Sequence, residues 1–109
     1  AEATAEKMTF ANYFAPRVTA VIGTHTHVQT ADEQIINGCA YITDAGMCGV
    51  YASILGRDTE EVIARSIYNE STRYTPAQGP AVISGVLIDI DEKTNRANQI
   101  ERVQIRPKG

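Results

Sequence analysis

The feature that most constrains this fold is an apolar segment leading directly into a pair of histidines. Residues 17–23, Arg-Val-Thr-Ala-Val-Ile-Gly, predict a strand whose end is apolar enough to be buried on both faces of a sheet. His25 and His27, the only histidines in the chain, follow at once. In extended backbone, side chains two residues apart lie on the same face. Since imidazole is a common metal ligand, the pattern predicts a metal site at the end of this strand.

The rest of the sequence alternates helical and strand patterns. Residues 1–14 predict a short helix that ends before Pro16, with Met8, Ala11 and Phe14 at helical spacing. Asn37-Gly38 separates two apolar runs, and this dipeptide is a strong hairpin signal because both residues tolerate positive φ. Strands are therefore expected at residues 33–36, 39–43, 82–90 and 97–106, the last two joined by a polar turn.

A second helix is expected at residues 59–68. Asp58 precedes it as the N-cap, and Glu61 follows three positions later. Val62, Ile63 and Ile67 form the side predicted to be buried. This mixture of helices and strands predicts an α/β or α+β fold with antiparallel edges.

Composition limits the function classes. A chain of 109 residues is one domain or part of one, and a net charge of −3 offers no broad attraction to nucleic acid or anionic membranes. No apolar run reaches the ~20 residues of a membrane span. Cys39 and Cys48 have no CxxC spacing, and we expect reduced thiols in a cytoplasmic protein.

Two histidines do not complete a metal site, because three or four protein ligands are usual. Asp32, Asp44, Cys39 and Cys48 are the nearby candidates for the others, and a His2Cys2 zinc site is one possible arrangement. Asp44 could equally be a carboxylate that orients a histidine, although a turn residue is the simplest interpretation. Both histidines could also be strand-end residues that only bond to their neighbours. The glycines after Asp44 predict a loop that can bring backbone N–H groups near an anion.

The run from Gly23 to Asp32, Gly-Thr-His-Thr-His-Val-Gln-Thr-Ala-Asp, closely resembles the C-terminal metal motif of the calcineurin-like metallophosphoesterases. It is most similar to the bacterial branch of 2′,3′-cyclic-nucleotide 2′-phosphodiesterases. The similarity extends over nearly the whole chain, including residues 40–44 and 88–91. Gln29, Cys48 and Val50 depart from the family pattern in ways that affect the loop and the fit of the substrate.

The resemblance implies that residues 1–109 are the C-terminal portion of a single four-layer α/β/β/α sandwich domain. It implies two metal ions, Fe and Mn in the first place and Zn or Mg otherwise, with His25 and His27 as one ligand to each. The metals would bind a phosphodiester or cyclic nucleotide and generate a hydroxide nucleophile for in-line attack. Thr24, Gly46, Met47 and Gly49 would position the phosphate.

The family's other ligands and its proton-donor histidine belong to motifs upstream of residue 1. We therefore expect this chain to need the N-terminal part of the enzyme as its partner and to be nearly inactive alone. Its exposed strand edges could also pair with a second copy.

Two other function classes are open from the residues alone. Amidohydrolases also end a strand in His-x-His, but they need further histidines, and none follows His27. The second alternative is a binding or interaction domain, not an enzyme, in which the His-x-His is incidental. Metal content separates the interaction domain from the phosphodiesterase.

Overall fold

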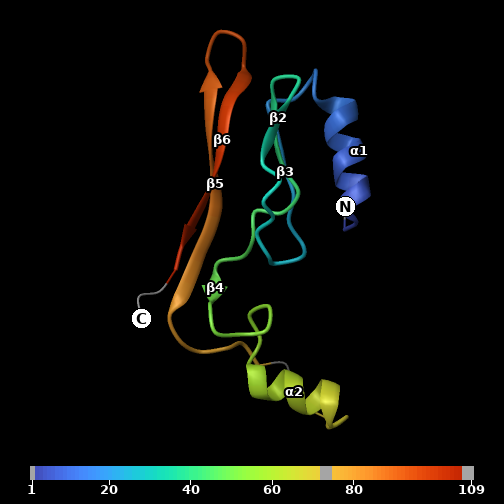
Figure 1. Cartoon of the computed structure of the whole chain (residues 1–109), viewed down its shortest axis with the longest axis vertical. Coiled ribbons are helices and arrows are strands. Elements are labelled where there is room, and N and C mark those ends of the chain that lie inside the picture. Colours follow the sequence, from blue (N-terminus) through green and yellow to red (C-terminus); the bar gives the residue numbers. More distant parts are fainter. Residues whose placement is uncertain (1, 72–74, 107–109) are drawn as a thin grey trace. The chain divides into compact units, whose positions relative to one another are not determined.

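The computed structural model describes residues 2–71 and 75–106, which form two compact units (Figure 1). The first unit takes in the chain up to Met47 and the segment Ser84–Gln104, and the second takes in Cys48–Ile83 and the residues from Ile105 onward. The described elements mix helices with parallel and antiparallel strands, so the α/β class is confirmed.

A three-stranded sheet forms the centre of the first unit. Its strands are β1 (Ala20–Ile22), β2 (Gln34–Ile36) and β3 (Cys39–Ile42), in the order β1-β3-β2. β3 lies in the middle, parallel to β1 and antiparallel to β2, and all four of its residues are buried. The predicted hairpin is confirmed, since Asn37 and Gly38 have φ values of 47° and 80°. The expected burial of β1 on both faces is wrong, because Ile22 is 38% exposed.

Helix α1 (Thr4–Phe14) lies beside this sheet (Figure 1). The helix agrees with the sequence prediction, and of the three apolar residues at helical spacing Ala11 is buried. Lys7, Ala11 and Ala15 are buried, whereas Met8 is 43% exposed. These three buried residues are spaced by four and so form one row along the helix. The buried row consists of two small side chains and the lysine stem, whereas the large side chains of Met8, Phe10 and Tyr13 are exposed.

The strands β5 (Ala81–Asp91) and β6 (Arg96–Ile105) form the predicted hairpin near the C-terminus. Within the first unit, this hairpin is bonded to the first sheet. Ala97 N donates to Gly38 O at 2.8 Å, and Thr19 Oγ1 donates to Asn95 O at 2.7 Å. The sheet that carries the loops after β1 and β3 is therefore supported at two points by the hairpin.

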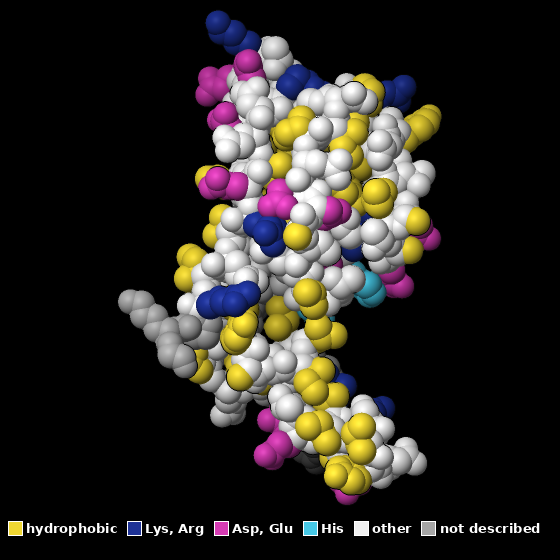
Figure 2. Space-filling view, in the orientation of Figure 1, with side chains coloured by type: hydrophobic (Ala, Val, Ile, Leu, Met, Phe, Trp, Pro, Cys, Tyr) yellow, Lys and Arg dark blue, Asp and Glu magenta, His cyan; other side chains and the backbone are white. Residues whose placement is uncertain are grey.

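The second unit contains a short strand and a capped helix. β4 (Gly49–Val50) pairs antiparallel with the first residues of β5. The glycine-rich sequence around residue 49 did not predict β4. Helix α2 (Thr59–Ile67) begins as predicted, with the Asp58 side chain accepting from Glu61 N at 3.0 Å. The predicted buried side of α2 is wrong, since Ile63 is 41% and Ile67 72% exposed. Figure 2 shows hydrophobic side chains gathered on this helix.

Two further observations concern membrane spans and cysteine pairing. No helix among the described residues is long and apolar enough to cross a membrane. Cys39 is buried and Cys48 is exposed, and neither takes part in a disulfide.

Candidate metal-binding loop and its buried support

The two histidines lie on a loop, not on an extension of β1. β1 ends at Ile22, and the backbone turns at His25 and His27, whose φ values are 118° and 69°. Residues other than glycine rarely adopt such φ values. The premise that both imidazoles project from one face of an extended strand is therefore wrong. Both residues are exposed, and histidine side chains are visible at the surface in Figure 2. Their role as metal ligands stays a prediction.

The segment after β3 holds this loop at both ends. Gly23 N donates to Ile42 O at 3.0 Å, and Ala45 N donates to Gly23 O at 2.9 Å. At the far end of the loop, Thr30 N donates to Asp44 O at 3.0 Å. The histidine loop and the chain after β3 therefore lie side by side, joined by backbone hydrogen bonds.

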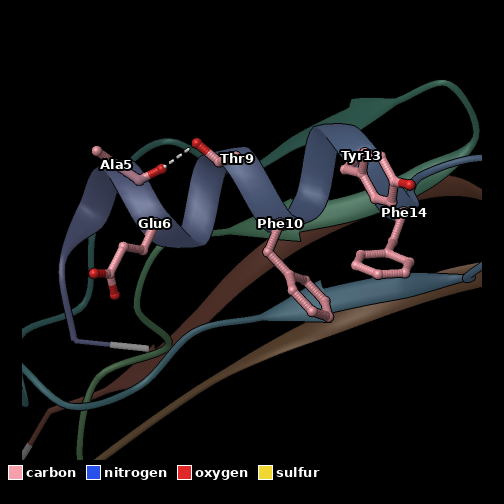
Figure 3. A pocket seen from close by; sticks show the side chains of 6 residues that line it. All are labelled: Ala5, Glu6, Thr9, Phe10, Tyr13 and Phe14. Atoms are coloured by element: carbon pink, nitrogen blue, oxygen red, sulfur yellow. Dashed lines mark hydrogen bonds between the residues drawn. The ribbon is translucent and has the colours of Figure 1, made fainter.

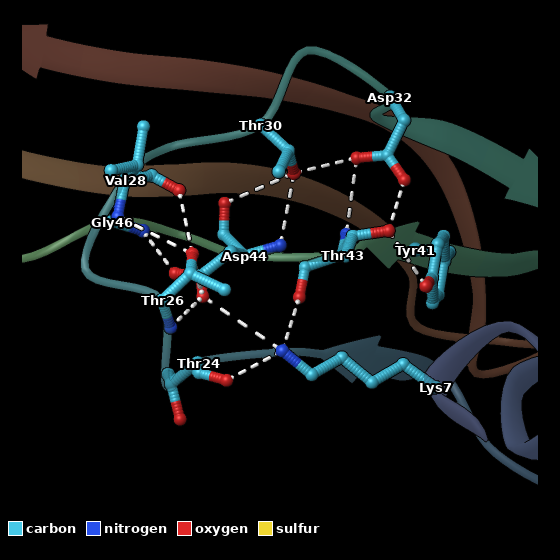
Figure 4. A network of polar contacts seen from close by, with 10 residues as sticks. All are labelled: Lys7, Thr24, Thr26, Val28, Thr30, Asp32, Tyr41, Thr43, Asp44 and Gly46. Atoms are coloured by element: carbon cyan, nitrogen blue, oxygen red, sulfur yellow. Dashed lines mark hydrogen bonds and ion pairs between the residues drawn. The ribbon is translucent and has the colours of Figure 1, made fainter. Parts of the chain in front are cut away.

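The Asp44 carboxylate lies at the centre of a polar network beneath this loop (Figure 4). Asp44 is fully buried. Its Oδ2 accepts from both donors of Thr26, the backbone N at 2.8 Å and the hydroxyl at 2.7 Å. Its Oδ1 accepts from Gly46 N at 2.9 Å. One carboxylate thus connects the residue between the two histidines to the glycine loop.

Lys7 brings helix α1 into the same network. Its side chain is 5% exposed, and its Nζ lies 3.8 Å from Asp44 Oδ2. The same ammonium donates to Thr24 O at 2.6 Å and to Thr43 O at 3.3 Å. Because a buried charge is costly unless it is paired and hydrogen-bonded, these contacts allow Lys7 to lie under the loop.

A second carboxylate, Asp32, supports the far end of the loop. Its Oδ1 accepts from Thr43 N at 3.1 Å and from Thr30 Oγ1 at 2.7 Å. Its Oδ2 accepts from the Thr43 hydroxyl, which also lies 2.8 Å from the Tyr41 hydroxyl. Asp32 therefore closes the loop against β3.

These contacts determine the ionisation of both carboxylates. Burial by itself raises the pKa of Asp44, but the hydrogen bonds from Thr26 and Gly46 and the charge of Lys7 outweigh it and lower the pKa below its usual value. Burial acts on Asp32 in the same sense, and there the hydrogen bonds from Thr43 and Thr30 lower the pKa. Both groups are therefore anions that accept hydrogen bonds at neutral pH.

The histidines supply only part of a metal site. Exposed imidazoles are suitable ligands for Fe, Mn or Zn. Within residues 2–71 and 75–106, however, no three or more His, Cys, Asp or Glu side chains come together as a metal-binding group. A His2Cys2 zinc site is therefore not formed. Asp32 and Asp44 have their oxygens directed at threonine and backbone donors, an arrangement that suits orientation of the loop better than ligation.

The sequence matches one protein family along almost its whole length. The model of the YmdB-like protein family matches residues 1–103. The chain belongs to this family. It is 53% identical over 106 residues to the Bacillus subtilis protein named 2′,3′-cyclic-nucleotide 2′-phosphodiesterase, in an alignment that covers 96% of this chain and 40% of that protein. The resemblance inferred from the histidine motif is thereby confirmed.

Solved structures agree with this assignment. A hypothetical protein from Thermus thermophilus superposes with a TM-score of 0.89 at 36% identity, over 98% of this chain and 42% of that one. A structure described as a novel phosphatase from Mycoplasma pneumoniae gives a TM-score of 0.89 at 36% identity, over 96% and 38% of the two chains. This YmdB-like chain thus spans about 40% of the length of the relatives that it matches.

The predicted phosphate-positioning residues of the YmdB-like chain fall in both units. Thr24 is exposed beside His25, and its carbonyl is held by Lys7. Gly46, with φ 87°, is joined to the histidine loop through Asp44, and Met47 follows it in the first unit. Gly49 lies in the second unit, in β4.

Helix α1 of this YmdB-like chain carries an open apolar hollow (Figure 3). Phe10 is 51% and Tyr13 71% exposed, and the Phe10 and Phe14 ring centroids are 4.6 Å apart. The hollow is lined by Ala5, Glu6, Thr9, Phe10, Tyr13 and Phe14. Three aromatic rings on one helix form an apolar surface with an exposed side.

Lys7 and Thr26 are the residues of this site that the sequence did not indicate. An isolated lysine in a helix is normally a solvated side chain, and only its spacing of four from Ala11 and Ala15 marks the buried row. Thr26 lies between two histidines, and nothing in the sequence distinguishes it from a spacer. Among the roles open to Asp44, the structure favours support of the loop, because its carboxylate bonds Thr26, the neighbour of both histidines.

Proposed function

We propose that the full-length protein is a metal-dependent phosphodiesterase and that this chain contributes its His-x-His loop. The observation that carries the proposal is an exposed pair of histidines on a loop fixed from below by Asp44, in a chain 53% identical to a protein named as a phosphodiesterase. The substrate class is a phosphodiester, with cyclic nucleotides as the first candidates. Neither the amidohydrolase nor the interaction-domain alternative has a comparable observation in its favour.

In this proposal His25 and His27 are ligands, one to each of two metal ions, with Fe and Mn as the first candidates and Zn or Mg as others. Bound metal ions supply positive charge to the phosphate and activate water. The remaining ligands come from the part of the protein outside this chain. The phosphate is positioned by the exposed Thr24, next to His25, and by Gly46 and Met47 of the same unit.

The aromatic hollow on α1 is the proposed contact with the rest of the enzyme. The chain spans about 40% of its relatives' length, and Phe10, Tyr13 and Phe14 present an apolar surface that a monomer of this size would normally cover. In the complete protein these rings pack within the four-layer α/β/β/α sandwich. Phe10→Glu should then destabilise the full-length protein strongly, which thermal unfolding would measure. An unchanged Tm would show that this face stays in solvent.

Metal analysis of the full-length protein tests the function directly. Mass spectrometry of purified protein should find about two transition metals per chain. Hydrolysis of bis-p-nitrophenyl phosphate with Mn²⁺ should fall by orders of magnitude in His25→Ala and in His27→Ala, while both variants keep the wild-type circular dichroism spectrum. Asn98→Ala, an exposed change on β6, serves as the control and should hydrolyse at the wild-type rate. Wild-type activity in both histidine variants would refute the proposal.

A further inference from the structure

The strained backbone at the two histidines must be held by its surroundings. His25 and His27 both have positive φ, at 118° and 69°, and conformations of this kind persist in non-glycine residues only where neighbouring structure determines them. Thr26, the residue between them, is bound directly by the buried Asp44 carboxylate. Both of its donors bond the same Asp44 oxygen.

Thr26 is fixed on its other side as well. Val28 N donates to the Thr26 hydroxyl at 3.4 Å. The same hydroxyl donates to Asp44 Oδ2 at 2.7 Å. The hydroxyl therefore lies between the loop backbone and the carboxylate. A methyl group in its place would fill the same space but make neither bond.

The Asp44 carboxylate is itself held rigidly. Gly46 N donates to its Oδ1, and Lys7 Nζ lies 3.8 Å from its Oδ2. Lys7 also donates to Thr24 O, one residue before the first histidine. Helix α1, the chain after β3 and the histidine loop therefore meet at one buried carboxylate. Its position determines the path of residues 24–27.

We propose that Asp44 is a positioning residue that acts through Thr26, holding the His25-Thr26-His27 backbone in the conformation that presents both imidazoles to metal. This inference rests on the proposed function, since it concerns the ligands of that same site. It adds a specific role for a residue outside the His-x-His motif. Polar partners that orient metal ligands typically change metal affinity or activity by about 10- to 100-fold when they are removed.

The test compares two threonines of the polar network beneath the loop in the full-length protein. Thr26→Val removes the hydroxyl bound to Asp44, and Thr43→Val removes the hydroxyl bound to Asp32. Both substitutions keep the side-chain shape, and each removes a hydroxyl that makes two hydrogen bonds, so both should lower Tm. Only Thr26→Val should weaken Mn²⁺ affinity and kcat, by about 10- to 100-fold, and Thr26→Ser should restore both.

Amide hydrogen exchange gives a readout that does not depend on activity. In wild-type protein the Thr26 N–H should be protected by its bond to Asp44, and Asp44→Asn should raise its exchange rate by about tenfold or more, as expected when a charge-assisted bond is weakened. Equal Mn²⁺ affinity and kcat in Thr26→Val and wild type, or an unprotected Thr26 amide, would overturn the positioning role alone. Wild-type protein that neither binds Mn²⁺ nor hydrolyses the diester would overturn the proposed function and, with it, this role.

Discussion

The backbone of Gly23 passes so close to that of Thr43 that a β-carbon on Gly23 would lie 1.8 Å from the Thr43 carbonyl oxygen. This approach lets Gly23 exchange hydrogen bonds with Ile42 and Ala45 as the chain leaves β1 for the histidine loop. Glycine is needed here for close approach and not for a special φ, because no side chain fits between the two backbones.

Gly23→Ala should therefore destabilise the protein by about 3 kcal/mol, since the backbones must separate to admit a methyl group. Gly85→Ala is the matched control, because a β-carbon on Gly85 meets no atom within 4 Å. That change should be neutral or stabilising by about 0.5 kcal/mol through its effect on the unfolded chain. Urea unfolding of both full-length variants would check this, and equal midpoints would contradict the close approach.

Arg96 gives a second prediction, because one guanidinium binds four backbone carbonyls. Its Nη2 donates to Ala15 O and Asn37 O at 2.5 Å each. Its Nη1 donates to Pro16 O and Val18 O at 3.3 Å each. Carbonyls at the end of a helix lack partners within the helix, so Arg96 satisfies the end of α1 and joins it to the β2–β3 turn.

Arg96→Lys should cost about 1–3 kcal/mol, because a single ammonium cannot reach all four oxygens. Arg102→Lys is its control. Arg102 Nε bonds Glu33 at 2.8 Å, but its side chain is 42% exposed, and such surface pairs contribute less than about 1 kcal/mol. The two free energies of unfolding would be measured in urea. A larger loss in Arg102→Lys would show that the four carbonyl contacts contribute little.

The features that the sequence predicted are those decided by neighbouring residues. Asn37-Gly38 specifies its hairpin because both residues accept positive φ, and Asp58 caps α2 because its acceptor reaches Glu61 N within the same turn. The strands 82–90 and 97–106 follow from apolar runs on either side of a polar turn. In each case the deciding contact is short in sequence.

The features that the sequence did not predict depend on contacts between distant segments. The path of the histidine loop is determined by Gly23 against Thr43 and by Thr26 against Asp44, and no local pattern at His25 encodes either contact. Lys7 is buried only because the Thr24 carbonyl and Asp44 approach it. The apolar stripe of α2 is evident from the sequence, but periodicity alone does not say whether a neighbour covers it.

The lowered pKa of Asp32 predicts a dependence of stability on pH. Its ionised form accepts from Thr43 and Thr30 in the folded protein only. That stabilisation is complete above the ordinary carboxyl pKa of 3.8 and is lost as the pH falls through the lower pKa of the folded state. The free energy of unfolding should therefore fall more steeply below that ordinary pKa in wild type than in Asp32→Asn. Carboxyl ¹³C shifts should place the Asp32 midpoint below 3.8, and a midpoint above it would contradict the network.

The backbone strain at His25 predicts that the histidine is retained at a cost in stability. A φ of 118° is far more accessible to glycine than to residues with a β-carbon. His25→Gly and His25→Ala both remove the imidazole, so both should lose metal-dependent hydrolysis equally. His25→Gly should nevertheless be the more stable of the two by about 1–3 kcal/mol, the usual size of such strain.

The same pair of changes at Val28 provides the control for this comparison. Val28 is exposed and is not among the residues with positive φ, so there glycine should be the less stable variant by about 0.5–1 kcal/mol. Urea unfolding of the four full-length proteins gives both differences. Opposite signs at the two positions would show that the loop keeps its strained conformation in solution. The same sign at both would mean that His25 relaxes to ordinary φ, and that Asp44 holds no strain there.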